Sequence, residues 1–121
     1  MNKRTEGTWY EDIAADYIKQ MGARIIKRNY RIRSGEIDII ARDGDYYCFI
    51  EVKYRKDDKC GEPETAVDFR KQRQISRVSR YFLYSFLKSE DIPIRYDVIA
   101  ISGEQSAVTL RWLKNAFDYM E

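Results

Sequence analysis

The sequence predicts one small α/β domain, a mixed β-sheet flanked by helices. A stretch with helical apolar spacing opens the chain, three strand-like stretches separated by turn signals follow, and a second helical stretch precedes two more strands. Strands on both sides of a helix in the chain favour a mixed sheet with helices packed on it. The 121 residues suit one domain, so we take 1–121 as a single unit.

The first predicted element is a helix over Thr5–Met21, in which apolar side chains recur at helical spacing. Two N-terminal caps are compatible with the sequence: Thr5, or Thr8 with Glu11 as a capping box. Gly22 is a natural stop.

Three strands are predicted next, over residues 23–33, 36–42 and 46–54. Ser34-Gly35 and Asp43-Gly44 mark the turns between them, and the second pair is a strong hairpin signal. Strict alternation along the second strand would put Ile37 and Ile39 on one face and Asp38 on the other.

Pro63 is predicted to open a long helix that runs to about Lys88. A strand over residues 94–102, a short strand over 107–110 and a last apolar turn or helix around Trp112–Phe117 follow. The predicted order is therefore α-β-β-β-α-β-β.

Histidine is absent, which excludes Ser-His-Asp and Cys-His triads and any nuclease with a histidine base. Chemistry must then come from carboxylates, lysine, arginine, tyrosine or a metal ion. No apolar run approaches the roughly 20 residues that span a bilayer, and the start of the chain is polar. We therefore expect a cytoplasmic protein with no signal peptide and no membrane partner.

The chemically informative residues are Asp38 and the sequence Glu51-Val52-Lys53. Glu51 and Lys53 lie two apart on a strand and so share a face, while the Asp43-Gly44 hairpin brings Asp38 to a similar height beside Glu51. Two adjacent carboxylates repel each other unless a cation or proton intervenes, and Mg²⁺ (or Mn²⁺) favours oxygen ligands. Lys53 would stabilise developing charge or help activate a water molecule, as metal-assisted phosphodiester hydrolysis requires.

Glu11 is a candidate fourth catalytic residue if the first helix packs across the open end of these strands. The alternative for all four residues is an ordinary half-buried strand pair with alternating charges and a solvated helix. The apolar lead-in Cys48-Phe49-Ile50, typical of a central strand, favours the catalytic interpretation.

Basic residues gather in three stretches although the formal net charge is only +2. They are candidates for contact with a nucleic-acid backbone, although each cluster alone is equally compatible with a solvated face. The residues singled out are Arg31, Arg33, Arg55, Lys71 and Arg73.

Several ordered motifs resemble the bacterial YraN-type family. They are Glu11, Arg28-Asn29-Tyr30-Arg31, Gly35-Glu36-Ile37-Asp38-Ile39-Ile40, Phe49-Ile50-Glu51-Val52-Lys53, Ala66-Val67 before Lys71, Arg95-Tyr96-Asp97-Val98 and Asn115-Ala116-Phe117. That family is assigned to the PD-(D/E)XK superfamily of predicted endonucleases and is similar to archaeal Holliday-junction resolvases. Ile37 stands where the superfamily's name has proline.

The resemblance implies a restriction-endonuclease-like sheet core. It implies Asp38, Glu51 and the Val52 carbonyl as metal ligands, Lys53 as the catalytic lysine and Glu11 as a carboxylate contributed by the helix. We expect a Mg²⁺-dependent endonuclease acting on DNA, including branched or damaged DNA. Small nuclease domains often dimerise so that two sites face two strands, which makes a homodimer one expectation. The alternative is a non-catalytic nucleic-acid-binding or protein-interaction module on the same fold.

Overall fold

The computed structural model describes residues 2–56, 67–89 and 91–121. Its elements are α1 (Lys3–Gln20), β1 (Arg24–Ile32), β2 (Gly35–Asp43), β3 (Tyr46–Arg55), α2 (Phe69–Phe82), the π-helical turn η3 (Leu83–Leu87), β4 (Ile94–Glu104) and β5 (Ala107–Phe117). The predicted mixed α/β architecture with two helices and five strands is present. The order differs from the prediction in one detail, the insertion of η3 between α2 and β4.

The strands form one sheet in the order β1-β2-β3-β4-β5. The β1–β2, β2–β3 and β4–β5 pairs are antiparallel, and the β3–β4 pair is parallel. The Asp43-Gly44 turn signal is correct, because Gly44 adopts a positive φ of 62° between β2 and β3. The parallel pair requires a long crossover, which contains α2.

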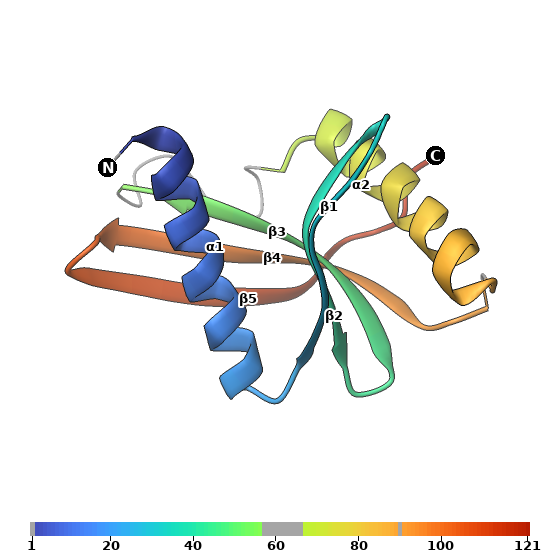
Figure 1. The fold of residues 1–121 in the computed structure, drawn as a ribbon, viewed down its shortest axis with the longest axis horizontal. Helices are drawn as coiled ribbons and strands as arrows, with labels where there is room; N and C mark the ends of the chain where they lie inside the picture. Colours follow the sequence, from blue (N-terminus) through green and yellow to red (C-terminus); the bar gives the residue numbers. More distant parts are fainter. Residues whose placement is uncertain (1, 57–66, 90) are drawn as a thin grey trace.

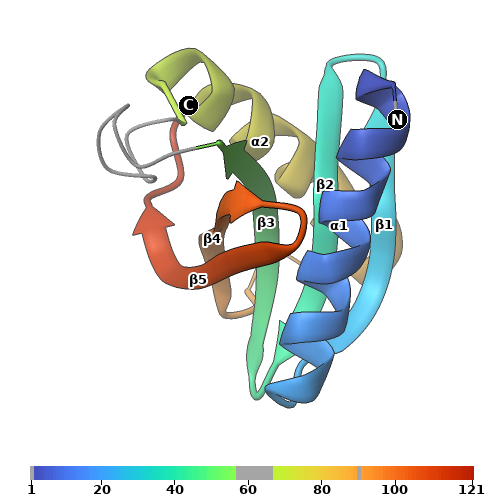
Figure 2. The same ribbon diagram turned by 90° about the vertical axis from the view of Figure 1, so that its left-hand side faces the viewer.

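The two helices cover opposite faces of the sheet (Figures 1 and 2). Ala14 and Ile18 of α1 pack against Ile39 and Ile50. Val78 and Phe82 of α2 pack against a second cluster that includes Phe49. Figure 2 shows the start of α1, the β1–β2 turn and the start of α2 at the same end of the sheet.

The helix starts differ from the predictions because side-chain caps fix them. Asn2 caps α1 by accepting a 2.8 Å hydrogen bond from the Thr5 N–H, so neither Thr5 nor a Thr8–Glu11 capping box begins the helix. Asp68 caps α2 through the Lys71 N–H, so this helix begins at Phe69. The predicted start at Pro63 lies outside the described residues. No described helix is long and apolar enough to cross a membrane.

The predicted end of the short strand at residue 110 and the predicted turn or helix after it are wrong, because β5 continues to Phe117. A buried carboxylate accounts for its irregular end. Asp97, fully buried in β4, accepts hydrogen bonds from Trp112 Nε1 (2.9 Å) and from the backbone N–H of Asn115 (2.8 Å), and Arg95 pairs with it at 2.9 Å. Asn115 adopts a positive φ of 56°, so the last residues of β5 stay tied to β4 through Asp97.

Candidate active site

Asp38 and Glu51 lie side by side where β2 and β3 begin to diverge. The antiparallel pairing runs from Asp43 opposite Tyr46 to Ile39 opposite Ile50, and Asp38 and Glu51 are the next residues on the two strands. The backbone N–H of Val52 donates a 2.9 Å hydrogen bond to Asp38 Oδ2. This bond fixes the Asp38 carboxylate beside the Glu51 backbone.

An irregularity in β1 accompanies this divergence. Arg28 pairs with Ile39 and Tyr30 pairs with Ile37, but Asn29 between them makes no ladder pair with Asp38. Asn29 has a φ of 52°, a left-handed conformation that asparagine tolerates better than most residues.

The side-chain alternation of β2 is interrupted at the same point. Ile37 packs in the cluster on the α2 side of the sheet and Ile39 in the cluster on the α1 side, so the prediction that they share a face is wrong. An interrupted alternation of this kind cannot be read from a two-residue period.

Glu51 is the most buried carboxylate of the site, with a relative exposure of 6%. Burial, reinforced by the negative charge of Asp38, raises the pKa of Glu51 to about 8, although Lys71 and Lys53 act in the opposite direction. Its Oε2 atom lies 3.7 Å from Lys71 Nζ and makes no hydrogen bond within the described part of the chain.

Glu11 brings a third carboxylate from α1. Burial, and then the charge of Asp38, raise its pKa to about 7, while Arg28 partly offsets the rise. Arg28 Nη2 is 3.9 Å from Glu11 Oε1, beyond hydrogen-bonding distance, and 2.8 Å from Asp12. Glu11 Oε1 is buried and makes no hydrogen bond to a described residue. Asp38 therefore acts electrostatically on both Glu11 and Glu51, and two buried oxygens have no hydrogen-bond partner among the described residues.

Two lysines flank the carboxylates. Lys53 follows Glu51 by two residues on β3, and its positive charge acts to lower the Glu51 pKa. Lys71 reaches the same carboxylate from α2. The sequence singled out Lys71 only as a backbone-binding residue. Its place beside Glu51 is a contact between distant parts of the chain, and no local signal indicated it.

The predicted nucleic-acid contacts lie on different elements of the described structure. Arg31 pairs with Glu36 at 3.1 Å and lines a hollow of about 520 Å³ beside Glu11. Arg33 is exposed just after β1, and Arg55 donates to the Tyr54 carbonyl at 3.0 Å. Lys71 and Arg73 both line a second hollow, along α2.

Within residues 2–56, 67–89 and 91–121, no three Asp, Glu or Cys side chains are grouped closely enough to hold one ion. A Mg²⁺ site does not require three, because this ion keeps several waters and often uses only one or two carboxylates. Asp38 and Glu51 match that donor set, and Glu51 Oε2, which accepts no hydrogen bond from a described residue, is the kind of oxygen that a hard cation binds.

The fold and the site together define a mixed α/β domain with a carboxylate pair between two lysines at one end of a five-stranded sheet. The chain belongs to the family described as Uncharacterised protein family UPF0102, whose profile matches residues 10–101. This is the family to which the YraN-type resemblance pointed.

Similar proteins match almost the whole chain. The UPF0102 protein of Lachnoclostridium phytofermentans is 44% identical over 118 residues, which cover 98% of this chain and 97% of the relative. That of Syntrophus aciditrophicus is 44% identical over 97% of this chain and 91% of its own length. A Legionella pneumophila relative is 36% identical over 93% and 94% of the two chains.

Proposed function

We propose that this protein is a metal-dependent endonuclease that hydrolyses phosphodiester bonds in DNA, on a sheet of the restriction-endonuclease-like, PD-(D/E)XK type. The observation that carries the proposal is the pair of buried oxygens, Glu11 Oε1 and Glu51 Oε2, that have no hydrogen-bond partner among the described residues. Both belong to carboxylates whose pKa values are raised by burial and by Asp38. A bound cation would resolve this unfavourable arrangement.

Asp38 and Glu51, with the Val52 carbonyl, would hold Mg²⁺ or Mn²⁺. Such an ion supplies a Lewis acid and lowers the pKa of bound water. The Val52 N–H keeps the Asp38 carboxylate in place at 2.9 Å, so this ligand is oriented before the ion arrives.

The remaining charged residues would handle protons and phosphate charge. Lys53 would offset the negative charge that develops on the phosphate during hydrolysis. Glu11, with a pKa of about 7, is close to the balance between its two protonation states at neutral pH, which suits a residue that accepts a proton from water.

A non-catalytic nucleic-acid-binding module has less support. The adjacent carboxylates of Asp38 and Glu51 repel phosphates, so a module that only binds nucleic acid gains nothing from them. DNA is the partner we propose, and a homodimer with two sites facing two strands stays a prediction.

The test is cleavage of supercoiled plasmid and of branched oligonucleotides in Mg²⁺ or Mn²⁺. We expect Asp38→Asn and Lys53→Met to abolish cutting, because each removes a group that the reaction needs. Lys56→Met is the matched control, since Lys56 is an exposed lysine three residues further on. If Lys53→Met cuts as fast as the wild type, the cleavage comes from a contaminant or from another site, and the proposal is wrong.

A further inference from the structure

A basic stripe on α2 continues into an aromatic one. Arg70, Gln74, Arg77, Tyr81 and Tyr84 follow one another at spacings of four, three, four and three residues, which align on one side of a helix. Arg70 to Tyr81 spans about 16 Å at the helical rise of 1.5 Å per residue. The stripe is therefore long enough to contact several nucleotides of an extended chain.

Two adjoining hollows run along this stripe. The first, of about 570 Å³, is polar, and its lining includes Arg70, Lys71, Gln74 and Arg77. The second, of about 390 Å³, is largely apolar and is lined by Ile32, Tyr81 and Tyr84 among others. Ser34 and Arg77 line both hollows, so the two are continuous.

The β1–β2 turn forms the opposite wall. Ser34 belongs to this turn, and Gly35 lies against the Gln74 side chain so closely that a Cβ at position 35 would collide with it. Lys71 lines the polar hollow and also lies 3.7 Å from Glu51 Oε2. Lys71 therefore connects the polar hollow to Glu51 of the candidate active site.

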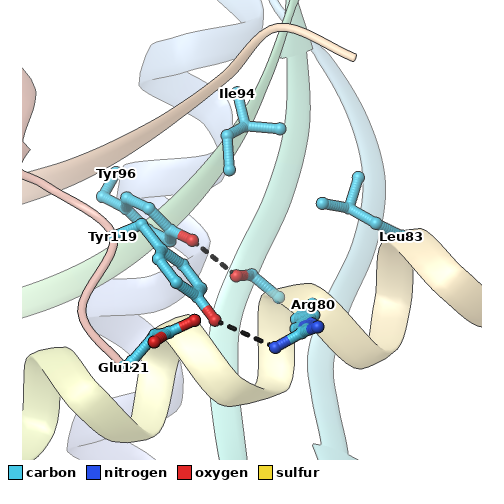
Figure 3. A pocket seen from close by; sticks show the side chains of 7 residues that line it. Arg80, Leu83, Ile94, Tyr96, Tyr119 and Glu121 are labelled. Atoms are coloured by element: carbon cyan, nitrogen blue, oxygen red, sulfur yellow. Dashed lines mark hydrogen bonds between the residues drawn. The ribbon is translucent and has the colours of Figure 1, made fainter. Parts of the chain in front are cut away.

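The arginines of α2 fall into two groups. Arg73 donates to the Glu121 carbonyl at 3.3 Å, and Arg80 donates to the Tyr119 hydroxyl at 3.5 Å (Figure 3). Figure 3 shows this second contact beside the hollow in front of Tyr96. Arg70 and Arg77 have no hydrogen bond or ion pair to a described residue. These two guanidinium groups are available to an external anion.

The acidic group in the polar hollow does not cancel this charge. The Asp68 carboxylate accepts the Lys71 backbone N–H at 2.8 Å, so it serves as the N-terminal cap of α2. Basic side chains outnumber the Asp68 carboxylate in the lining of the hollow: they are Arg70, Lys71, Arg73 and Arg77.

The two tyrosine rings of the stripe, which line the apolar hollow, are exposed, Tyr81 at 53% and Tyr84 at 70%. An exposed ring beside an unpaired guanidinium is suited to a strand that presents bases and phosphates together, because bases stack on the ring and phosphates bind the guanidinium. A duplex hides the faces of its bases, so these rings add affinity only for an unpaired strand.

We propose that the stripe from Arg70 to Tyr84 binds an unpaired DNA strand and leads it past Lys71 to the candidate active site. Cutting beyond the Lys71 end of this stripe rests on the proposed function, whereas binding along the stripe does not. A second copy of the chain is a poorer occupant. A two-fold contact over this patch would bring the Arg70 and Arg77 residues of both copies together, and like charges would oppose it.

The experiment measures binding in EDTA, so its result does not depend on cleavage. The probes are a labelled oligothymidylate of about 12 nucleotides and a duplex of the same length, followed by fluorescence anisotropy. We expect the wild type to prefer the single strand. We expect the double variant Tyr81→Ala/Tyr84→Ala to weaken single-strand binding by about tenfold or more and duplex binding by less than about twofold.

Two further variants separate stacking from charge. Arg77→Gln should weaken binding of both probes and reduce the salt dependence by about one counterion. Tyr46→Ala is the matched control, because Tyr46 is 44% exposed but lies at the β2–β3 turn. Its affinities should stay within about twofold of the wild type.

The inference is overturned if the wild type binds both probes equally, or if the tyrosine double variant binds the single strand as the wild type does. Tighter binding of oligouridylate than of oligothymidylate would replace DNA by RNA as the occupant. Dissociation of a dimer by the double variant, with unchanged oligonucleotide affinity, would assign the patch to a second copy. If the strand binds as expected but no metal supports cutting, the proposed function is wrong, while the inference that the stripe binds an unpaired strand is confirmed.

Discussion

Replacing Glu51 with glutamine should stabilise the metal-free protein, although it removes a candidate metal ligand. Burial and the charge of Asp38 raise the pKa of Glu51 from 4.5 to about 8. Between these values the folded state binds more protons than the unfolded state, so stability falls as the pH rises from about 4.5 through about 8. At 1.36 kcal/mol per pKa unit, the shift sets a ceiling of roughly 5 kcal/mol, reached above about pH 8.

Glutamine has nearly the same shape as glutamate and stays neutral, so Glu51→Gln removes this penalty. The buried amide of the new glutamine needs hydrogen bonds, and leaving them unmade lowers the free energy of unfolding by about 1–3 kcal/mol. We therefore expect the variant to be more stable than the wild type by about 2–4 kcal/mol near pH 8.5. Near pH 5 the penalty on the Glu51 carboxylate is below about 1 kcal/mol, so the same amide cost should leave the variant less stable than the wild type by up to about 2 kcal/mol.

The assay is urea unfolding in EDTA at both pH values, with Glu104→Gln as the control because Glu104 is exposed at the end of β4. Added Mn²⁺ should then raise the melting temperature of the wild type and leave that of Glu51→Gln unchanged. An equal or lower stability of Glu51→Gln near pH 8.5, or the same gain at both pH values, would refute the burial argument.

Two further predictions concern the lysine and the buried aspartate. Lys71→Met should tighten Mn²⁺ binding by roughly three- to tenfold in calorimetry, because it removes a cation that lies 3.7 Å from Glu51. The loss of this positive charge favours a bound divalent ion about twice as strongly as it favours a proton that competes for the same carboxylate. Arg70→Met is the control, and unchanged or weaker binding by Lys71→Met would contradict the expectation. Asp97→Ala should lower the free energy of unfolding by about 3 kcal/mol or more, since it leaves the partly buried Arg95 without its nearest buried partner. A loss below about 1 kcal/mol would show that the other contacts of Arg95 suffice.

The sequence was most informative where local rules apply. The Asp43-Gly44 turn, the strand character of 46–54 and the apolar faces of both helices follow from turn chemistry and periodicity, and all three are present. Elements whose ends depend on distant contacts were less predictable. The sequence divided the last strand into a short strand and a turn or helix, because the pairing of this strand with β4 and its hydrogen bond to Asp97 have no local signature.

The candidate site shows the same division. The two-residue spacing of Glu51 and Lys53 and the hairpin beside them were enough to predict that Asp38 and Glu51 lie together. The missing strand pairing between Asn29 and Asp38 depends on the left-handed conformation of Asn29. The contact between Lys71 and Glu51 depends on how α2 packs on the sheet. Neither can be derived from spacing along one strand.

The central claim, a metal site at Asp38 and Glu51, is tested most directly by isothermal titration of Mn²⁺ and Mg²⁺ into the protein. Wild type, Asp38→Asn and Glu51→Gln would be compared at about pH 8, near the midpoint of the Glu51 titration. We predict that the wild type binds the metal and that both substitutions abolish binding while the variants remain folded. Absence of binding by the wild type, with and without added DNA, or binding that both variants retain, would contradict the account.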